Sequence, residues 1–509
     1  MGIQPNLRVG KLIYSRLNKS LMNHKSFGLD DERSETMKRE RPLVSALVRF
    51  AEKEPLSWHV PGHKNGLVSN LPAPIKSALT YDLTELTGLD DYHHPEEAIM
   101  HAEALLAKTY EANRSYFLVN GSTVGNLAMI YATCKKNEKI IVQRNAHKSI
   151  FHALELVGAK AIFISPEWDE KTATPGVVPT ATLQEALQLH PDAKAVVLTY
   201  PTYYGVAGDE LKIQIEMCHK MRVPVLVDEA HGAHFIASSK FPPSALQLGA
   251  DVVVQSAHKT LPAMTMASFM HVNSSLVDEE KVNHYLRMLQ SSSPSYLLLA
   301  SLDDARDYLQ HYLKSDAFYL MEKRNQWIEA LQSLQPLQII EVDDALKLLM
   351  RLPGYTGFQL KEALEQHGVY VELADPYQVL FILPLLKQGQ PYPFAETRIR
   401  IKEAILSLRL KEERKPQISP SLNERSTVSI PDYSYDEMEQ LEKEWVPYMR
   451  AIGRTAAGML IPYPPGIPLF LPGEKITVAK LSQLEELLSV GAAFQGKHRL
   501  DEKLVYVLK

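Results

Sequence analysis

The chain has 509 residues, of which 45% are hydrophobic and 23% charged, and its formal net charge is −5. That length is typical of roughly three domains, and the composition is typical of a globular protein. Because no apolar run approaches the roughly 18 residues that span a bilayer and the basic residues form no dominant block, we expect neither a membrane nor a nucleic-acid partner.

The N-terminal segment differs from the rest of the chain. The basic residues that precede its first acid, Asp30, are Arg8, Lys11, Arg16, Lys19 and Lys25. It lacks the apolar region of a secretory signal, so we interpret residues 1–36 as a disordered N-terminal extension rather than a targeting peptide. Met37 begins "MKRERPLVSALVRFAEKEP", which predicts an amphipathic helix, and we assign residues 37–65 to an N-terminal arm.

From about residue 115 to 260, apolar strand-like runs alternate with helix-length segments. The runs are "SYFLV", "KIIVQ", "AIFIS", "AVVLTY", "VPVLVD" and "ADVVVQ". Such alternation predicts an α/β domain with a mainly parallel sheet and crossover helices. We assign residues 66–308 to this large domain.

A helical pattern follows between residues 300 and 334, where the apolar residues Leu309, Leu313, Ala317 and Leu320 share one face. We expect one long helix that links the large domain to a second unit. Residues 309–410 would contain this linker helix and a small α/β domain, in which "DALKLLMRL", "VYVEL" and "QVLFILP" are strands and "GFQLKEALEQHG" is a helix stopped by glycine.

The last part of the chain begins with a polar, proline-bearing stretch, residues 411–426, which we interpret as a linker. Residues 427–509 would form a C-terminal domain. In it, "YDEMEQLEKEWVPYM" has a helical pattern, and "IPYPPGIPLFLPGE" has prolines and glycines that exclude a regular helix. The two cysteines, Cys134 and Cys218, are too few to hold such a chain together and favour a reducing compartment, the cytoplasm.

Polar residues follow the predicted strands, and ligands of open parallel sheets bind outside the carboxyl ends of the strands. After "SYFLV" comes "NGSTVGNLAMIYA", where Gly121 permits a tight turn and Ser122 and Thr123 can cap the next helix. Such a helix N-terminus suits a phosphate, although a Ser or Thr cap is also ordinary. Later strand ends present His147, then Asp228 with His231.

The stretch "VVVQSAHKTLPAM", residues 252–264, places Lys259 just after a strand. A buried ammonium must find a counter-charge or lose its proton, and a deprotonated lysine is a nucleophile. The alternative is a lysine whose charged end reaches the surface. The neighbouring strand ends decide between these interpretations.

Phosphate donors, an imidazole, a carboxylate and a lysine together match the needs of pyridoxal 5′-phosphate (PLP). Lys259 can form a Schiff base, Asp228 can keep the pyridine nitrogen protonated, and a flat imidazole can cover the ring. Donors for the phosphate are Ser122, Thr123, Ser256 and His258. As an alternative, Asp228, His231 and His234 recur at spacings of three and could ligate zinc or iron.

Many motifs of this chain resemble those of the PLP-dependent ornithine/lysine/arginine decarboxylases, a family of aspartate-aminotransferase fold (PLP fold type I). The similar segments, in the family's order, are "WHVPGHKNG", "LDDYHHPEEAI", "FLVNGSTVGN", "PTYYGV", "VDEAHGAHF", "SAHKT", "QSSSPSYLLLASLD" and "YPPGIPLFLPGE". The resemblance covers about residue 40 to the C-terminus. The chain resembles the shorter branch of the family, so we expect it to be without the N-terminal receiver-like domain of the long bacterial members.

The resemblance implies roles for individual residues. Lys259 would be the Schiff-base lysine, Asp228 the partner of the pyridine nitrogen, and His147 the side chain that stacks on the ring. Ser122, Thr123, Ser256 and His258 would bind the phosphate, and Ala230 and His231 would lie close to the ring. Since the family's active site lies between two subunits, Ser292 or Ser293 would reach a partner's cofactor in a homodimer, or in a tetramer built from two dimers.

We therefore expect a carboxy-lyase that converts lysine, arginine or ornithine to the matching amine and carbon dioxide, in polyamine metabolism. An aminotransferase or aldol-type lyase on the same fold, or an inactive relative that binds other subunits, are the alternatives. A decarboxylase should have no arginine that pairs with the α-carboxylate, whereas an aminotransferase would use one. The arginines to check for such a contact are Arg351, Arg398 and Arg400. Acids that could bind the distal cation of the substrate are Glu85, Asp90, Asp91, Glu372, Asp375 and Glu474.

Overall fold

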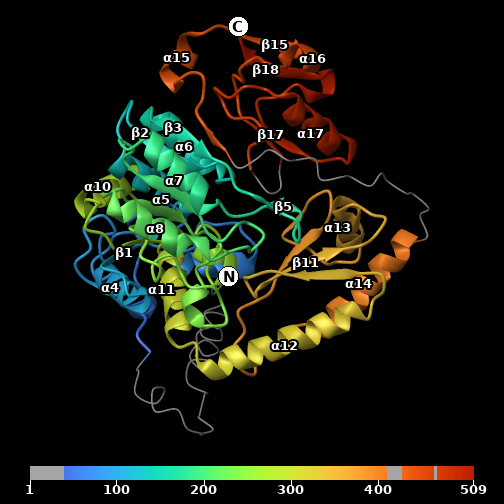
Figure 1. Cartoon of the computed structure of the whole chain (residues 1–509). Coiled ribbons are helices and arrows are strands. Elements are labelled where there is room, and N and C mark those ends of the chain that lie inside the picture. The colour runs from blue at the N-terminus through green and yellow to red at the C-terminus, as the bar shows by residue number, and fades with distance from the viewer. Residues whose placement is uncertain (1–38, 410–426, 463–466) are drawn as a thin grey trace.

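The structure is a computed structural model that describes residues 39–409, 427–462 and 467–509. Figure 1 shows a large domain, a smaller domain beside it that is edged by a long helix, and a C-terminal domain above the large one. The expected extension, residues 1–36, and the expected linker, residues 411–426, lie outside the described residues.

An eight-stranded sheet in the order β1-β9-β8-β7-β6-β2-β3-β14 forms the centre of the large domain. Its strands are β1 (Arg114–Leu118), β2 (Lys139–Gln143), β3 (Lys160–Ile164), β6 (Val196–Thr199), β7 (Val225–Asp228), β8 (Val252–Gln255), β9 (Ser268–Val272) and β14 (Val428–Ser429). The middle strands β8, β7, β6, β2 and β3 are parallel, which confirms the mainly parallel α/β sheet. Strand β9 was not predicted and runs antiparallel to both β8 and β1.

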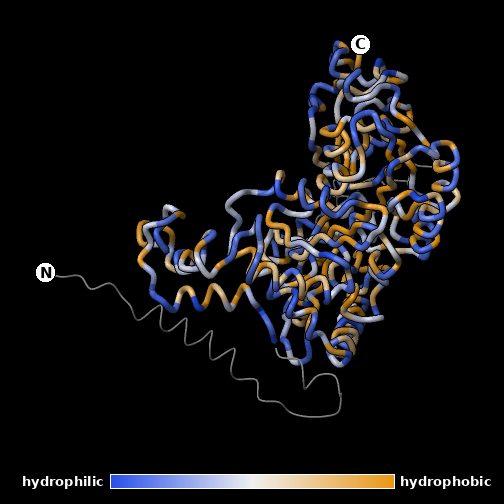
Figure 2. Tube along the Cα trace, turned by 90° about the vertical axis from the view of Figure 1, so that its left-hand side faces the viewer, coloured by the Kyte–Doolittle hydropathy of each residue, from blue (hydrophilic) through white to orange (hydrophobic). Residues whose placement is uncertain are grey.

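Helices cover both faces of this sheet, as buried parallel strands require. One face carries α5 (Gly121–Thr133), α6 (Lys148–Val157) and α10 (Glu279–Leu289). The other carries α2 (Pro42–Glu52), α4 (Ala98–Tyr110), α7 (Thr180–Leu189), α8 (Glu210–Lys220) and α11 (Tyr296–Gln310). Consecutive strand residues alternate between the faces, so Ile141 packs in one buried cluster and Val142 in the other. Figure 2 shows that hydrophobic stretches recur among hydrophilic ones along the whole described chain.

Short elements complete the large domain: α3 (Ala73–Lys76), η1 (Ser77–Thr80), the hairpin of β4 (Trp168–Asp169) with β5 (Thr174–Pro175), η2 (Phe235–Ala237) and α9 (Ala257–Thr260). The single long helix expected between residues 300 and 334 is instead two helices. It breaks because Leu313 is extended and donates its backbone N–H to the Asp316 carboxylate at 2.9 Å, which starts α12 (Lys314–Gln332). The predicted domain boundary at residue 308 falls inside α11.

The small domain is an antiparallel sheet in the order β10-β11-β13-β12 with two helices. Its elements are β10 (Gln338–Glu341), β11 (Lys347–Arg351), α13 (Gly357–Gln366), β12 (Leu373–Ala374), β13 (Val379–Ile382) and α14 (Phe394–Arg409). The predicted strand "VYVEL" is therefore shorter than expected, because only its last residue pairs with β13.

In the C-terminal domain, the prediction of one helix over "YDEMEQLEKEWVPYM" is wrong beyond Gln440. The helix α15 (Tyr435–Gln440) ends there, and β15 (Lys443–Pro447) pairs with β18 (Leu504–Leu508) far along the chain. The Trp445 and Tyr506 rings pack across this pair with centroids 4.8 Å apart. The remaining elements are α16 (Tyr448–Ala451), β16 (Leu460–Pro462), α17 (Val478–Ser489), β17 (Phe494–Gly496) and η3 (Leu500–Glu502).

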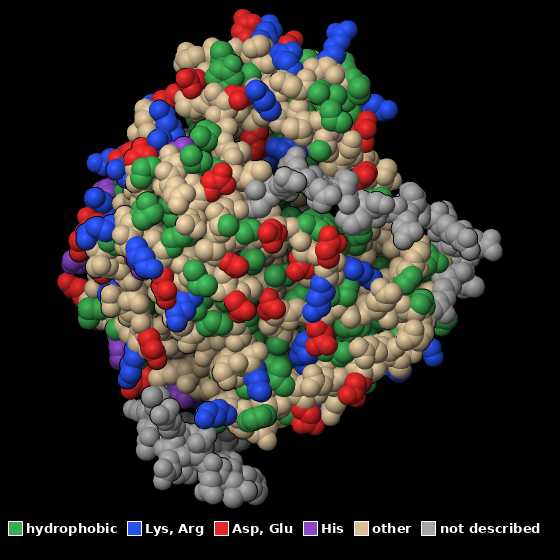
Figure 3. Space-filling view, viewed as in Figure 1, with side chains coloured by type: hydrophobic (Ala, Val, Ile, Leu, Met, Phe, Trp, Pro, Cys, Tyr) green, Lys and Arg blue, Asp and Glu red, His purple; other side chains and the backbone are tan. Residues whose placement is uncertain are grey.

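On the face seen in Figure 3, acidic and basic side chains are interspersed among apolar ones. Among the helices of the described residues, none combines the length and the apolar character that crossing a membrane requires.

Candidate active site

A cavity of about 300 Å³ lies at the carboxyl ends of the parallel strands of the large sheet. Three of these strands end beside it with Thr199, Asp228 and the Ser256 that follows β8. The residues predicted from sequence that line this cavity are Ser122, Thr123, His147, Asp228, Ala230, His231, Ser256, His258 and Lys259. Its size is within the usual range for sites that bind small molecules.

Lys259 lies in the one-turn helix α9, immediately after β8. Its Nζ is 3.0 Å from Nε2 of His231 and 5.5 Å from the centre of the Tyr203 ring. Burial lowers the pKa of the Lys259 ammonium, while the charges of Asp228 and Glu372 act in the opposite direction. Burial and the Lys259 charge also hold the pKa of His231 well below 6.5, so this imidazole is neutral and accepts a hydrogen bond from Nζ.

Asp228 is the last residue of β7, and only 2% of it is exposed. One carboxylate oxygen, Oδ2, accepts a hydrogen bond from Nδ2 of Asn126 at 2.9 Å, and the other accepts from the backbone N–H of Ala230 at 3.1 Å. Asn126 was not singled out in the sequence, although it lies in "GSTVGN". Its amide also donates to Ser149 Oγ at 2.9 Å, so helices α5 and α6 together fix the carboxylate.

His147 is the N-cap of α6, and its Nδ1 accepts from the backbone N–H of Ser149 at 3.3 Å. Burial lowers the pKa of His147 to about 4, although the nearby Asp228 raises it. The ring is therefore neutral at pH 7, with the acceptor nitrogen turned to the α6 backbone. An uncharged flat ring beside Asp228 suits stacking on an aromatic ligand.

The N-terminus of α5 borders the same cavity. Asn120 is the N-cap of this helix and makes no side-chain cap hydrogen bond, so the expectation that Ser122 or Thr123 caps it is wrong. Both residues lie within the first turn, after Gly121 with its φ of +78°. Ser122 Oγ accepts a hydrogen bond from Ser256 Oγ at 2.8 Å. Two hydroxyls beside free N–H groups of a helix N-terminus form a suitable anion site.

Ser292 and Ser293 lie on the exposed loop between α10 and α11 and are not among the residues that line this cavity. The loop stays next to the site, because the backbone N–H of Ser291 donates to Oδ1 of Asn120 at 3.1 Å. That Ser292 or Ser293 reaches the site of a partner subunit stays a prediction.

The acids proposed for the distal cation of a substrate have different surroundings. Asp90 accepts the backbone N–H groups of Glu97 and Ile99 at the start of α4, and Asp91 accepts that of His93. Glu85 accepts the hydroxyl of the neighbouring Thr84. Asp375 and Glu474 bind other residues of their own domains and of the large domain.

Glu372 is the exception among these acids, because it lies beside the cavity. It accepts the hydroxyl of Tyr203 at 3.2 Å, and its charge raises the pKa of Lys259. Tyr203 itself lines the cavity, as does Ile467 of the C-terminal domain, which the sequence did not indicate.

The two histidines proposed as alternative metal ligands contact different partners. Nε2 of His234 is 2.9 Å from Asp344 of the small domain, whereas His231 contacts Lys259. Within the described ranges, no group of three or more His, Cys, Asp and Glu side chains is placed to hold a metal ion.

Comparisons with known proteins agree with this geometry. A family model described as Orn/Lys/Arg decarboxylase, major domain, matches residues 41–347, and the model of the family's C-terminal domain matches residues 420–497. The sequence is 43% identical to the YaaO protein of Bacillus subtilis, over 92% of this chain and 98% of that one. It is 33% identical to an arginine decarboxylase of the same organism, again over 92% and 98%. The fold is similar to the solved constitutive lysine decarboxylase of Escherichia coli, with a TM-score of 0.74, 20% identity and coverage of 92% of this chain and 82% of that one.

Proposed function

This chain belongs to the Orn/Lys/Arg decarboxylase family, and we propose that it removes the α-carboxylate of a basic amino acid with bound PLP, releasing carbon dioxide and the matching amine. The observation that carries the proposal is the convergence of Lys259, Asp228 and His147 on one cavity beside the N-terminus of α5. Such amines are the building blocks of polyamines, so the product would enter polyamine metabolism.

The residues of the cavity fit the cofactor. The first turn of α5 with Ser122, Ser256 and His258 would hold the phosphate, because it offers hydroxyls, an imidazole and unpaired helix N–H groups. Asp228 would bind the pyridine nitrogen, and the neutral His147 would cover the ring. When bound, PLP supplies an electron sink for the electron pair that the lost carboxylate leaves behind.

The surrounding side chains control protons in this site. Burial favours the uncharged amine of Lys259, which is its nucleophilic form. Nε2 of the neutral His231 lies 3.0 Å from Nζ and can accept a proton from it. Asn126 and the Ala230 N–H keep the Asp228 carboxylate oriented. These residues thus prepare an amine and a carboxylate at the carboxyl ends of two neighbouring parallel strands before any substrate binds.

The arginines of the small domain support loss of the carboxylate over amino transfer. Arg351 donates to Gln378 and to the Lys171 carbonyl, Arg398 to the Ala330 carbonyl, and Arg400 to Glu396. Among the described residues that line the cavity there is no arginine. A substrate carboxylate that is not clamped by an ion pair keeps less ground-state stabilisation and is lost more readily.

Arginine is the substrate that we propose to test first, because relatives described as arginine decarboxylases are 32–34% identical to this chain, whereas the lysine decarboxylases are 23–24% identical. Glu372 beside Tyr203 is the candidate for the distal cation. Side chains exposed near the N-terminal arm, such as Leu56, Trp58 and Leu67, support a homodimer that buries them, either alone or paired into a tetramer. The free, buried cysteines Cys134 and Cys218 support a reducing compartment, the cytoplasm.

The test is product analysis with the purified protein and PLP. Incubation with arginine, lysine or ornithine should release carbon dioxide and the matching amine without an added keto acid, and Lys259→Ala should abolish the release. Borohydride reduction of the loaded protein followed by peptide mapping should find the cofactor on Lys259. Keto-acid-dependent amino transfer, an aldol-type cleavage, or a protein that binds PLP without turnover would each reject the decarboxylase function.

A further inference from the structure

Lys347 of the small domain is a buried cation that the reaction described above does not use. It is the first residue of β11 and is 0% exposed. Its Nζ donates to the carbonyl oxygen of Tyr203 at 2.8 Å and to that of Thr202 at 3.4 Å, both in the large domain. Burying an ammonium costs several kcal/mol unless its donors are satisfied, so this contact between domains needs a reason.

Two neighbours of Lys347 hold the same loop of the large domain. The carboxylate of Asp343 accepts the backbone N–H groups of Ala207 at 2.7 Å and Gly208 at 3.1 Å. The backbone N–H of Asp344 donates to the Gly205 carbonyl at 3.0 Å. We call Asp343, Asp344 and Lys347 the brace. All three fix the main chain of residues 202–208 from the side of the small domain.

The loop wraps closely around the brace at Gly205. This glycine has a φ of +95°, and a Cβ atom placed on it would lie 2.8 Å from Cδ of Lys347 and 3.2 Å from Cβ of Asp344. A larger residue would therefore push the loop away from the lysine stem. The fit shows that this loop and the brace are packed as one unit.

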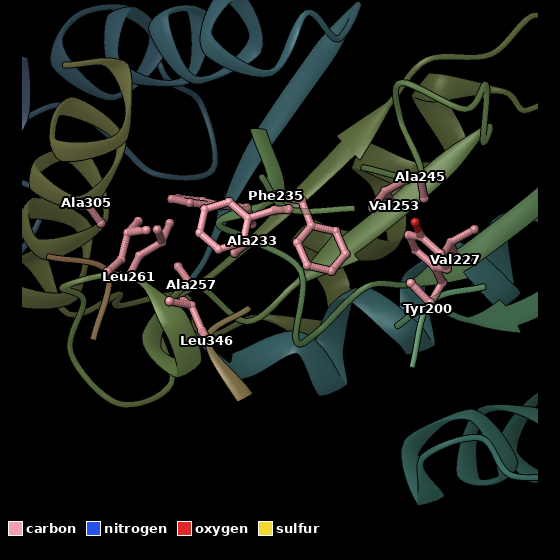
Figure 4. Packing of buried hydrophobic residues seen from close by; sticks show 14 of the residues in the cluster. Tyr200, Val227, Ala233, Phe235, Ala245, Val253, Ala257, Leu261, Ala305 and Leu346 are labelled. Atoms are coloured by element: carbon pink, nitrogen blue, oxygen red, sulfur yellow. The ribbon is translucent and has the colours of Figure 1, made fainter. Parts of the chain in front are cut away.

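The loop in turn places Tyr203 in the active site. The ring of Tyr203 is 4.4 Å from the His231 ring, between centroids, and 5.5 Å from Nζ of Lys259. On the other side, Leu346 of the brace segment packs in the buried cluster that contains Ala257 and Leu261, which flank the turn of Lys259 (Figure 4). The brace and the neighbouring Leu346 thus pack against the structures on both sides of the catalytic lysine.

The charge of Lys347 acts on the same groups. Burial lowers the pKa of Lys347 to about 8, Asp344 and Glu372 raise it, and Lys259 lowers it further. Repulsion between two ammonium groups is mutual, so Lys347 also disfavours a proton on Lys259. Its charge contributes to the lowered pKa of His231 as well.

We propose that Lys347 is a positioning residue, which fixes Tyr203 against His231 and Lys259 through two backbone carbonyls. Its positive charge, buried beside the same site, would also disfavour a proton on the catalytic lysine. The small domain would then set both the geometry and the protonation of the active site. The inference rests on the proposed function of Lys259.

Lys347→Met tests the proposal, because methionine keeps much of the stem and removes the charge. The matched control is Lys361→Met on α13, where the lysine is 32% exposed and pairs with the nearby Glu365. In the PLP-loaded protein, we expect the pH midpoint of the cofactor's visible absorption to move to higher pH in Lys347→Met and to stay unchanged in Lys361→Met. We also expect kcat to fall about 10- to 100-fold with a smaller change in KM, as a displaced group near the reacting atoms produces.

Two further measurements keep the inference separate from the proposed function. In the cofactor-free full chain, competitive acylation followed by mass spectrometry reports the pKa of Lys259, which should rise in Lys347→Met even if the cofactor proves to bind another lysine. Should Lys347→Met fail to fold, Asp343→Ala at the exposed end of the brace should still lower kcat several-fold. A folded Lys347→Met with an unshifted midpoint and an unshifted Lys259 pKa would overturn the proposal, as would an Asp343→Ala protein with unchanged kcat.

Discussion

Replacing Arg144 with methionine should loosen the C-terminal domain from the large domain. Arg144 directly follows β2, and its Nε and Nη2 each lie 2.7 Å from an oxygen of Glu474. Its Nη1 donates to the Pro468 carbonyl at 2.8 Å. The two side chains are only 13% and 10% exposed. This bidentate pair is therefore largely shielded from solvent and joins two domains.

The expected magnitude follows from this environment. Breaking a buried ion pair by removing one partner costs roughly 3–5 kcal/mol. Here the carboxylate keeps a second cation, because Lys480 Nζ remains 2.9 Å from Oε2 of Glu474, so we expect a smaller loss than this, about 2–3 kcal/mol. Such a loss raises the equilibrium constant of local opening roughly 30- to 150-fold.

Hydrogen–deuterium exchange of residues 467–474 measures that opening. The control is Arg499→Met, which removes an arginine of the C-terminal domain whose pair with Glu502 is 44% and 53% exposed and which should leave the exchange of these residues nearly unchanged. Burial opposes the charge of Glu474, but Arg144 and Lys480 hold its pKa below the usual 4.5. The difference in exchange between wild type and Arg144→Met should therefore be largest above pH 4.5. It should shrink as the pH falls through the lowered pKa of Glu474.

Equal exchange in Arg144→Met and Arg499→Met at pH 7 would refute this reasoning. A difference in exchange that does not narrow below pH 4.5 would show that packing of the arginine stem, rather than the ion pair, holds the domains together.

Three further outcomes are expected. Asn126→Ala removes an amide donor from the Asp228 carboxylate and should weaken PLP binding about tenfold in equilibrium dialysis. An unchanged affinity for PLP would contradict the role of Asn126. Burial raises the pKa of Glu229 from 4.5 to about 8, so the stability of wild type should fall as the pH rises between these values. In thermal unfolding, Glu229→Gln should not show this fall. Parallel plots of melting temperature against pH for the two proteins would count against a buried, uncharged carboxyl. Gly125→Ala places a Cβ 2.8 Å from side chains of β1 and β8. It should lower the free energy of unfolding, measured by urea titration, by about 1–3 kcal/mol. An unchanged free energy of unfolding would show that the sheet can shift there.

The sequence predicted the elements whose cause is local. The apolar runs of the parallel strands and the polar residues that follow them were visible without the structure, and Asp228, His147 and Lys259 do meet in one cavity. Elements that depend on distant partners were missed. β9 is antiparallel between β8 and β1, and the stretch around Trp445 has helical spacing but extends because β18 pairs with it.

The same division holds within the active site. The sequence pointed to the chemistry of Lys259 but not to its contact with His231, which depends on how two strand ends approach each other. Lys347 looks like an ordinary lysine at a strand start, and only the docking of the small domain shows that it is buried. Ile467 is likewise invisible until the C-terminal domain is in place.

The ion pair between Arg144 and Glu474 also bears on how the chain matures during synthesis. Its partners are 330 residues apart, and ribosomes add about 5–20 residues per second, so Arg144 is added to the chain roughly 15–70 seconds before Glu474. During that interval the parallel sheet can form, but the wall of the cavity that Ile467 provides is still absent. A nascent chain of this protein would thus acquire its sheet early and its finished active site only when translation is nearly complete.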